Sequence, residues 1–169
     1  ELVERAIRTK GIIPDEIRYR EIGIIGNDRS GERNPAKRAL KENGSPFGIK
    51  RMDYEASGGG EIFLSCEDER GTIAGFIRLR LPTRGSVEGI GADTALIREL
   101  HVYGSEVPIH GAGTVQHRGL GRELLAEAER IAGEEASRKK MLIISGVGVR
   151  EYYRKSGYKR SGSYMAKKL

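Results

Sequence analysis

The chain of 169 residues is long enough for one domain with a real core, and its 37% hydrophobic and 32% charged content excludes a disordered protein. No apolar run approaches the roughly 18 residues that cross a membrane, and the charged opening at residues 1–10 excludes a signal peptide. The single cysteine, Cys66, excludes a disulfide framework within the chain. These features favour a cytoplasmic protein that makes no membrane contact.

The net charge of +6 is unevenly distributed along the sequence. Residues 61–137 carry 8 basic and 13 acidic side chains, whereas residues 138–169 carry 10 basic and 1 acidic. A basic segment of this kind suits a polyanion such as nucleic acid, because phosphate contacts need positive charge and no particular base sequence. The alternative is a solvated face that keeps the protein in solution.

The first elements in chain order are weakly patterned. Residues 1–10 predict a helix and residues 17–23 a short strand. Residues 26–46 are polar and rich in Gly, Pro and Asn, which predicts a loop with a helical turn at 36–42. We therefore expect residues 1–46 to be a connecting segment. The chain has no initiator Met and opens inside the predicted helix, so we expect it to be part of a longer protein.

A sheet-forming domain is predicted over residues 47–169. Strands are expected at 47–56, 61–68 and 72–81, with a break at Gly58–Gly60 and a turn at 69–71 that makes the second and third strands an antiparallel pair.

The strand predicted at 94–104 alternates between two faces. A period of two predicts one face with Leu96, Arg98, Leu100 and Val102, and the other with Ile97, Glu99, His101 and Tyr103.

An amphipathic helix, an apolar strand, a second short helix and a final strand complete the predicted domain. The helix begins near Gly119, and the later elements are expected near 141–147, 149–158 and 164–168. Strand, helix and apolar strand in this order predict a right-handed parallel crossover within a mainly antiparallel α/β sheet. The residues expected on the buried stripe of the first helix are Leu120, Leu124, Leu125, Ala128, Ile131 and Ala132.

The turn "QHRGLG", Gln116–Gly121, leads directly into that helix. A helix N-terminus presents unpaired N–H groups and a partial positive charge, and glycines let the backbone approach an anion closely. Arg118 and Arg122 add positive charge there. The turn therefore suits a phosphate group, while a tight turn whose glycines serve packing is the alternative. A dinucleotide-binding fold is not favoured, because the turn lies late in a largely antiparallel chain.

The order of features over residues 94–158 resembles the GNAT acetyltransferase superfamily, which has a splayed central strand, a phosphate turn and a helix bearing an aromatic–Tyr pair. Here that pair is Tyr152–Tyr153, followed by Gly157 and Tyr158. The strings "RELHVYG", "QHRGLG", "LLAEAERIA", "ISGVGVREYYRKSGY" and "SYMAKK" resemble the C-terminal acetyltransferase domain of the Elongator catalytic subunit, over roughly residues 50–169.

This resemblance implies a GNAT fold, with a mixed, mainly antiparallel sheet, a splayed central strand, one parallel crossover and flanking helices. It implies acetyl-CoA as cofactor, tRNA as partner, and a radical SAM domain elsewhere in the same protein, which together modify wobble uridine. The residues implied to contact acetyl-CoA are Glu99, Leu100, His101, Val102, Gln116, Gly119, Leu120, Gly121, Arg122, Glu123, Tyr152 and Tyr153.

The resemblance also implies the catalytic groups. Tyr153 is expected near the thioester sulfur as the proton donor, with Tyr152 in the core or at its rim. Glu99 and His101 share a face of their strand, so either is a candidate general base. A structural salt bridge is the alternative role for Glu99, and Cys66 is expected to be a buried structural thiol.

The family's cysteine-rich segment is absent from this chain. Pro14, Glu16 and Tyr19 stand where cysteines are expected, and His101, His110 and His117 lack metal-ligand spacing. No metal is therefore expected.

Two other functions stay open. One is a general GNAT N-acetyltransferase acting on protein lysine or a small amine. The other is a non-catalytic RNA-binding module that keeps the fold.

Overall fold

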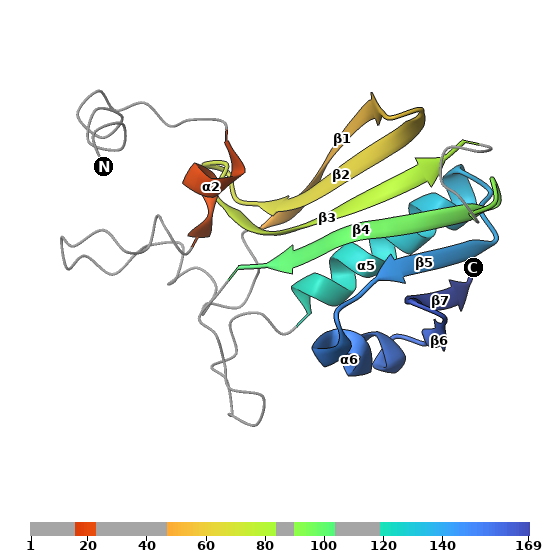
Figure 1. The fold of residues 1–169 in the computed structure, drawn as a ribbon. Helices are drawn as coiled ribbons and strands as arrows, with labels where there is room; N and C mark the ends of the chain where they lie inside the picture. The colour runs from red at the N-terminus through yellow and green to blue at the C-terminus, as the bar shows by residue number, and fades with distance from the viewer. Residues whose placement is uncertain (1–15, 23–46, 84–89, 104–118) are drawn as a thin grey trace. The chain divides into compact units, whose positions relative to one another are not determined.

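The computed structural model describes residues 16–22, 47–83, 90–103 and 119–169 (Figure 1). The helix predicted at 1–10 and the loop predicted at 26–46 therefore lie outside the described residues. The chain divides into two compact units, and the described part of the smaller unit comprises residues 16–22, 47–48, 67–74 and 103. The larger unit comprises residues 49–66, 75–102 and 119–169, of which all but 84–89 are described.

The smaller unit corrects the strand predicted at residues 17–23. Ile17–Arg20 form a single helical turn, α2, and only Glu21 makes a strand-like bridge, parallel to Ile73. The alternation of Ile, Arg, Tyr and Arg is typical of a strand, which explains the wrong prediction. In the observed turn, the Arg20 side chain forms an ion pair with Glu67 and donates a hydrogen bond of 2.9 Å to the Gly71 carbonyl.

The described strands form one seven-stranded sheet in the order β1-β2-β3-β4-β5-β7-β6 (Figure 1). Only β4 and β5 are paired in parallel among the registers that the structure gives, which confirms the predicted mixed sheet with one parallel crossover. The elements that follow α2 are β1 (Gly48–Ala56), β2 (Gly59–Glu67), β3 (Ile73–Pro82), β4 (Thr94–Val102), α5 (Leu120–Arg130), the π-helical turn η1 (Ile131–Glu135), β5 (Lys140–Ile144), the 3₁₀ turn η2 (Val147–Val149), α6 (Arg150–Lys155), β6 (Lys159–Ser161) and β7 (Tyr164–Lys168).

Helix α5 covers one face of the sheet and completes the main hydrophobic core (Figure 1). All six residues predicted for its apolar stripe are buried. They pack with Ile77 and Leu79 of β3 and with Ala95 and Ile97 of β4. Burying a large aliphatic side chain contributes about 1.5–3 kcal/mol relative to leaving it exposed, so this face supplies much of the stability of the larger unit.

Strand β4 contains a β-bulge that changes which side chains face the core. Arg78 is paired with Glu99 but Leu79 with Ile97, so Arg98 is the extra residue. Leu100 packs against the same core as Ile97, although strict alternation predicted opposite faces. The predicted alternation is therefore wrong beyond Ile97, because one inserted residue shifts every later side chain to the other face.

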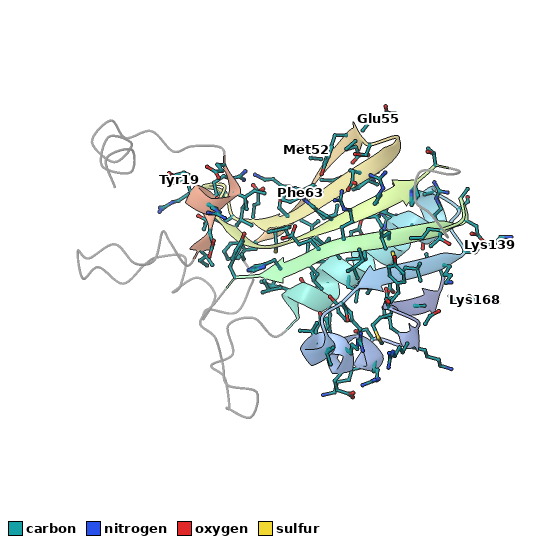
Figure 2. All side chains as sticks on the ribbon, viewed as in Figure 1. Tyr19, Met52, Glu55, Phe63, Lys139 and Lys168 are labelled. Carbon is teal, nitrogen blue, oxygen red and sulfur yellow. The ribbon has the colours of Figure 1, made fainter. Side chains whose placement is uncertain are left out.

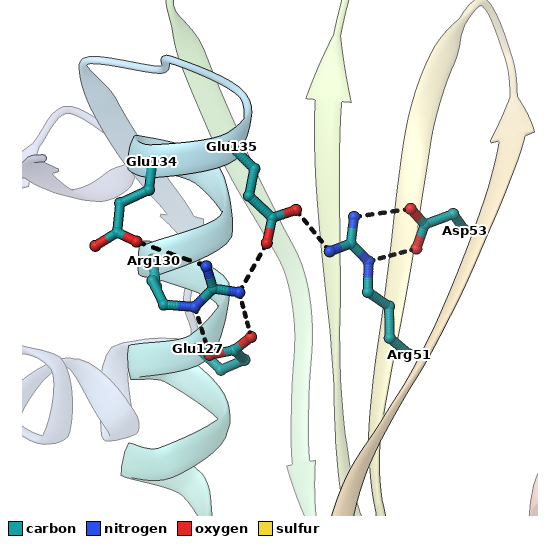
Figure 3. Close-up of polar contacts among 6 residues, drawn as sticks. All are labelled: Arg51, Asp53, Glu127, Arg130, Glu134 and Glu135. Atoms are coloured by element: carbon teal, nitrogen blue, oxygen red, sulfur yellow. Dashed lines mark hydrogen bonds and ion pairs between the residues drawn. The ribbon is translucent and has the colours of Figure 1, made fainter.

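An exposed network of ion pairs connects β1 with the end of α5 and with η1 (Figure 3). Arg51 of β1 forms an ion pair of 2.6 Å with Glu135, and Glu135 also contacts Arg130 at 2.7 Å. Arg130 contacts Glu127 at 2.7 Å in turn. Apart from this network, β1 is exposed on both faces, and Met52 is 63% exposed (Figure 2).

Candidate functional site

The central strands diverge where β4 passes its bulge. Parallel pairing with β5 runs from Thr94↔Lys140 to Ile97↔Ile143 and ends there, whereas pairing with β3 continues to Val102. Over the described residues, β4 from Glu99 onward therefore has a strand partner on one side only. Its other edge presents backbone N–H and C=O groups that an extended ligand can pair with.

Helix α5 begins beside this open edge. Its N-cap residue is Gly119, with φ 130° and ψ −38°, and no described side chain caps the helix. The amides of Arg122 and Glu123 donate to the Gly119 carbonyl at 2.7 and 2.8 Å. The preceding amides of the first turn, those of Leu120 and Gly121, have no acceptor within the helix, because a helix leaves its first N–H groups unpaired. This end of α5 is therefore a candidate anion site.

Gly121 brings the helix and α6 into close contact. A Cβ added at Gly121 would lie 2.7 Å from the Tyr152 hydroxyl oxygen and 3.4 Å from Val102 Cγ2. Val102, Gly121 and Tyr152 thus meet at one point, although they come from β4, α5 and α6. The Tyr152 hydroxyl is buried and has no hydrogen-bond partner among the described residues. A buried unpaired hydroxyl is costly, which makes this one a candidate to bind a ligand group.

The two tyrosines of α6 occupy different environments. Tyr153 is only 6% exposed and belongs to the main core, whereas Tyr152 is half-buried and packs against that core. Burial raises the pKa of both phenols above the usual 10, and nearby Arg122 partly opposes this for Tyr152. Both hydroxyls therefore stay protonated at neutral pH. The hypothesis that Tyr153 points squarely at the thioester remains a prediction, and the structure adds Tyr152 as the hydroxyl beside the anion site.

Glu99 and His101 lie on the face of β4 opposite α5. Their partners on β3 are Arg78 and Phe76, which share that face. Glu99 is 3.9 Å from Arg78, and the His101 ring stacks on Phe76 with centroids 6.0 Å apart. Both side chains are exposed, so a substrate can reach them from this face. The salt bridge expected as an alternative role for Glu99 is thus present, although it is long and exposed.

The remaining predicted contacts divide between described and undescribed residues. Leu120, Arg122 and Glu123 are in the first turn of α5. The Glu123 carboxylate lies 3.5 Å from where a Cβ of Gly119 would be, so it shares the turn expected to hold phosphate. Gln116 and the histidines at positions 110 and 117 lie outside the described residues.

The sequence did not predict the roles of two residues near the site. Glu61 is a buried carboxylate on β2, and Arg98 is the bulge residue that contacts it. The only signal in the sequence was a charged residue within a predicted strand, which is also common on exposed faces. In the part of the chain that is described, no three His, Cys, Asp or Glu side chains gather as metal ligands, and no helix is long and apolar enough to span a membrane.

A strand edge that opens beside the start of a helix is the geometry expected of an acetyl-CoA site, and comparison with known proteins assigns the chain to a family. Residues 34–158 match the model of the acetyltransferase (GNAT) family. The chain therefore belongs to the GNAT acetyltransferase family, whose members use acetyl-CoA.

More specific similarity extends over the full chain. A tRNA uridine(34) acetyltransferase of Methanocaldococcus jannaschii is 45% identical, and Elongator complex protein 3 of Homo sapiens is 39% identical, each over 100% of this chain. The chain spans 30% of the length of each of these relatives. The solved structure of Methanocaldococcus infernus Elp3 with an N-terminal deletion aligns with a TM-score of 0.77 at 43% identity, covering 99% of this chain and 38% of that one. These similarities confirm the resemblance to the Elongator catalytic subunit.

Proposed function

We propose that this chain binds acetyl-CoA and transfers or hydrolyses its acetyl group as the acetyltransferase domain of a tRNA uridine-modifying enzyme. The observation that carries the proposal is the meeting of Val102, Gly121 and the unpaired Tyr152 hydroxyl where β4 leaves β5. The similarity to tRNA uridine(34) acetyltransferases supplies the substrate class.

The pyrophosphate of the coenzyme would bind at the first turn of α5. Amides of Gly119, Leu120 and Gly121 are the proposed donors, and Arg122 supplies positive charge. Gln116 would also contact the pyrophosphate. The Glu123 carboxylate would have to turn away as the pyrophosphate binds, because the two negative charges would repel each other within the same helical turn.

The pantetheine arm would pair with the open edge of β4. Glu99, Leu100, His101 and Val102 provide backbone groups there, as a strand does for an added neighbour. Leu100 and Val102 face α5, so their side chains hold the edge in place while their backbone groups remain available.

Acyl transfer needs a base on one side of the thioester and an acid on the other. The coenzyme supplies an activated acetyl thioester. Glu99 or His101 would take the proton from the acceptor, and Tyr153 would give one to the departing sulfur. Glu99 and His101 lie on one face of the sheet and Tyr153 on the other, and the thioester would lie where β4 is no longer paired with β5.

The basic end of the chain would hold tRNA. Four basic side chains on α6 and β6 are exposed: Arg154, Lys155, Lys159 and Arg160. The radical SAM domain is the proposed partner within the full-length protein, since the chain covers only 30% of its relatives.

The decisive experiment measures acetyl-CoA binding and release of free thiol by this chain, with and without tRNA, at two salt concentrations. Coenzyme binding with tRNA-stimulated thiol release supports the proposal. Coenzyme binding without any tRNA response at either salt concentration favours a general N-acetyltransferase, and tRNA binding without coenzyme binding favours the non-catalytic module.

A further inference from the structure

The bulge residue of β4 is held by a buried carboxylate on the sheet face opposite α5. Arg98 Nη1 donates a hydrogen bond of 2.8 Å to Glu61 Oε1. The Glu61 side chain is 1% exposed, whereas the Arg98 side chain is 46% exposed. Arg98 thus reaches from the bulge across β3 to β2, with its guanidinium partly in solvent.

Glu61 already has a closer partner. Arg80 Nη1 donates to the same oxygen at 2.7 Å, and the Arg80 side chain is 5% exposed. Arg80 also donates to the carbonyls of Ala56 and Ser57, at 3.0 and 2.9 Å, so it fixes the turn between β1 and β2. Arg80 and Glu61 therefore form a charge-balanced buried pair, and Arg80 also anchors this pair to the turn between β1 and β2.

Arg80 already neutralises Glu61, so the contact between Arg98 and Glu61 has a different effect. It holds in place the bulge residue itself, which has no partner on β3. If the bulge moved along the strand, the register beyond it would shift, and Leu100 and Val102 would turn away from α5. The open edge and the contact of Val102 with Gly121 would then be lost together.

We propose that Arg98 is a positioning residue for acetyl-CoA, which acts through Glu61 to hold the β4 bulge and with it the strand edge that receives the pantetheine arm. The proposal rests on the proposed function. It assigns Arg98 no contact with the phosphates, because the anion site is built from the first turn of α5 on the other face of the sheet.

The test compares two ligands. Acetyl-CoA needs both the phosphate turn and the strand edge, whereas adenosine 3′-phosphate 5′-diphosphate lacks pantetheine and needs only the turn. We expect Arg98→Ala to raise the Kd of acetyl-CoA about tenfold and to leave the Kd of the nucleotide within about twofold. Arg98→Lys keeps a cation that can reach Glu61, and it should retain acetyl-CoA affinity within about threefold.

The control is Arg130→Ala, which removes an arginine of similar exposure at the far end of α5. It should change neither Kd. An equal loss of both ligands in Arg98→Ala, or no loss of either, would overturn the proposal. If the unaltered chain binds neither ligand, the proposed function fails, and this inference fails with it. If the unaltered chain binds acetyl-CoA but Arg98→Ala does not show the expected difference between the two ligands, only this inference fails.

Discussion

At the scale of single residues, the two tyrosines of α6 lie in different surroundings, Tyr153 in the main core and Tyr152 against Gly121. The rings of Tyr152 and Tyr153 meet edge to face, with centroids 5.1 Å apart and planes at 81°. Neighbours on a helix point about 100° apart, so the sequence predicts that the two side chains diverge. It does not predict which hydroxyl lies against Gly121, because that depends on where α6 packs relative to α5.

We predict that Tyr153→Phe lowers kcat for thiol release about 10- to 100-fold with little change in KM, because it removes the hydroxyl of the proposed proton donor and keeps the ring that is expected to contact the coenzyme. Tyr152→Phe should instead raise KM, since its hydroxyl lies beside the anion site. Steady-state kinetics of both variants checks this. The opposite pattern would exchange the roles of the two residues.

A second prediction concerns Gly121. Replacing glycine by alanine within a helix normally stabilises the helix by about 1 kcal/mol. At position 121, however, the alanine Cβ would lie 2.7 Å from the Tyr152 hydroxyl oxygen. Gly121→Ala alone should therefore lower the free energy of unfolding. Combined with Tyr152→Phe, the same change should be neutral or stabilising, because the next tyrosine atom is 3.6 Å away.

Urea denaturation of the four proteins in this cycle gives the coupling energy between the two sites. Additive effects would show that the hydroxyl does not limit the space at Gly121.

At the scale of elements, α5 continues into the π-helical turn η1, and its end is tied to β1 by charge. Hydrogen bonds from Arg130 lower the pKa of Glu127, and those from Arg51 and Arg130 lower the pKa of Glu135. A carboxylate with a lowered pKa in the folded state stabilises the fold above its usual titration range. That contribution is lost as pH falls below about 4.5.

We predict that Glu135→Gln lowers Tm at pH 7 and low salt by at most about 3 °C, because exposed ion pairs contribute little individually but Glu135 joins two arginines. The difference from the unaltered protein should shrink as pH falls from about 5 to 3, and also in 1 M salt, as checked by thermal denaturation.

Glu151→Gln is the matched control, since it removes one exposed pair with Arg154 and no bridge between elements. An equally large fall in Tm for this control would mean that the connection from β1 to η1 adds nothing to stability.

Most elements were predictable from periodicity, but the two errors have local causes. The buried stripe of α5 and the parallel pairing of β5 follow from apolar spacing alone. The bulge at Arg98 does not, because a bulge is defined by the partner strand and leaves the sequence alternation unmarked. Ile17–Arg20 alternates like a strand, but its backbone forms a helical turn in which the Tyr19 amide donates to the Glu16 carbonyl, and Arg20 of this turn contacts Glu67 and Gly71. The three-residue strand β6 has no apolar alternation to reveal it.

At the scale of the larger unit, positive charge gathers late in the sequence and at one edge of the sheet. Lys159 and Arg160 lie on β6, the last strand in the sheet order, whereas β1 is the first. Lys139 directly precedes β5 and Lys168 is the last residue of β7, so both lie in the same part of the sheet (Figure 2). Charge composition predicted a polyanion partner, but only the sheet order shows which surface carries the charge.

We predict that replacing Lys159 and Arg160 together by Gln weakens tRNA binding and lowers the slope of log K against log salt by about 1.4–1.8, if both contact phosphates. Filter binding across a salt series measures the slope. Lys50→Gln on β1, at the other edge of the sheet order, should leave the slope unchanged. An unchanged slope in the double variant would place the RNA elsewhere.

Within the described part of the chain, β4 has no strand partner on its β5 side beyond Ile97, which has a consequence for aggregation. A strand with free N–H and C=O groups is a template for pairing with another chain, and it promotes aggregation when nothing covers it. A bound pantetheine arm would occupy this edge, and binding to the folded state also raises stability by mass action. We therefore expect the chain to aggregate more slowly on heating when acetyl-CoA is present, so that the cofactor protects the fold as well as supplying the acetyl group.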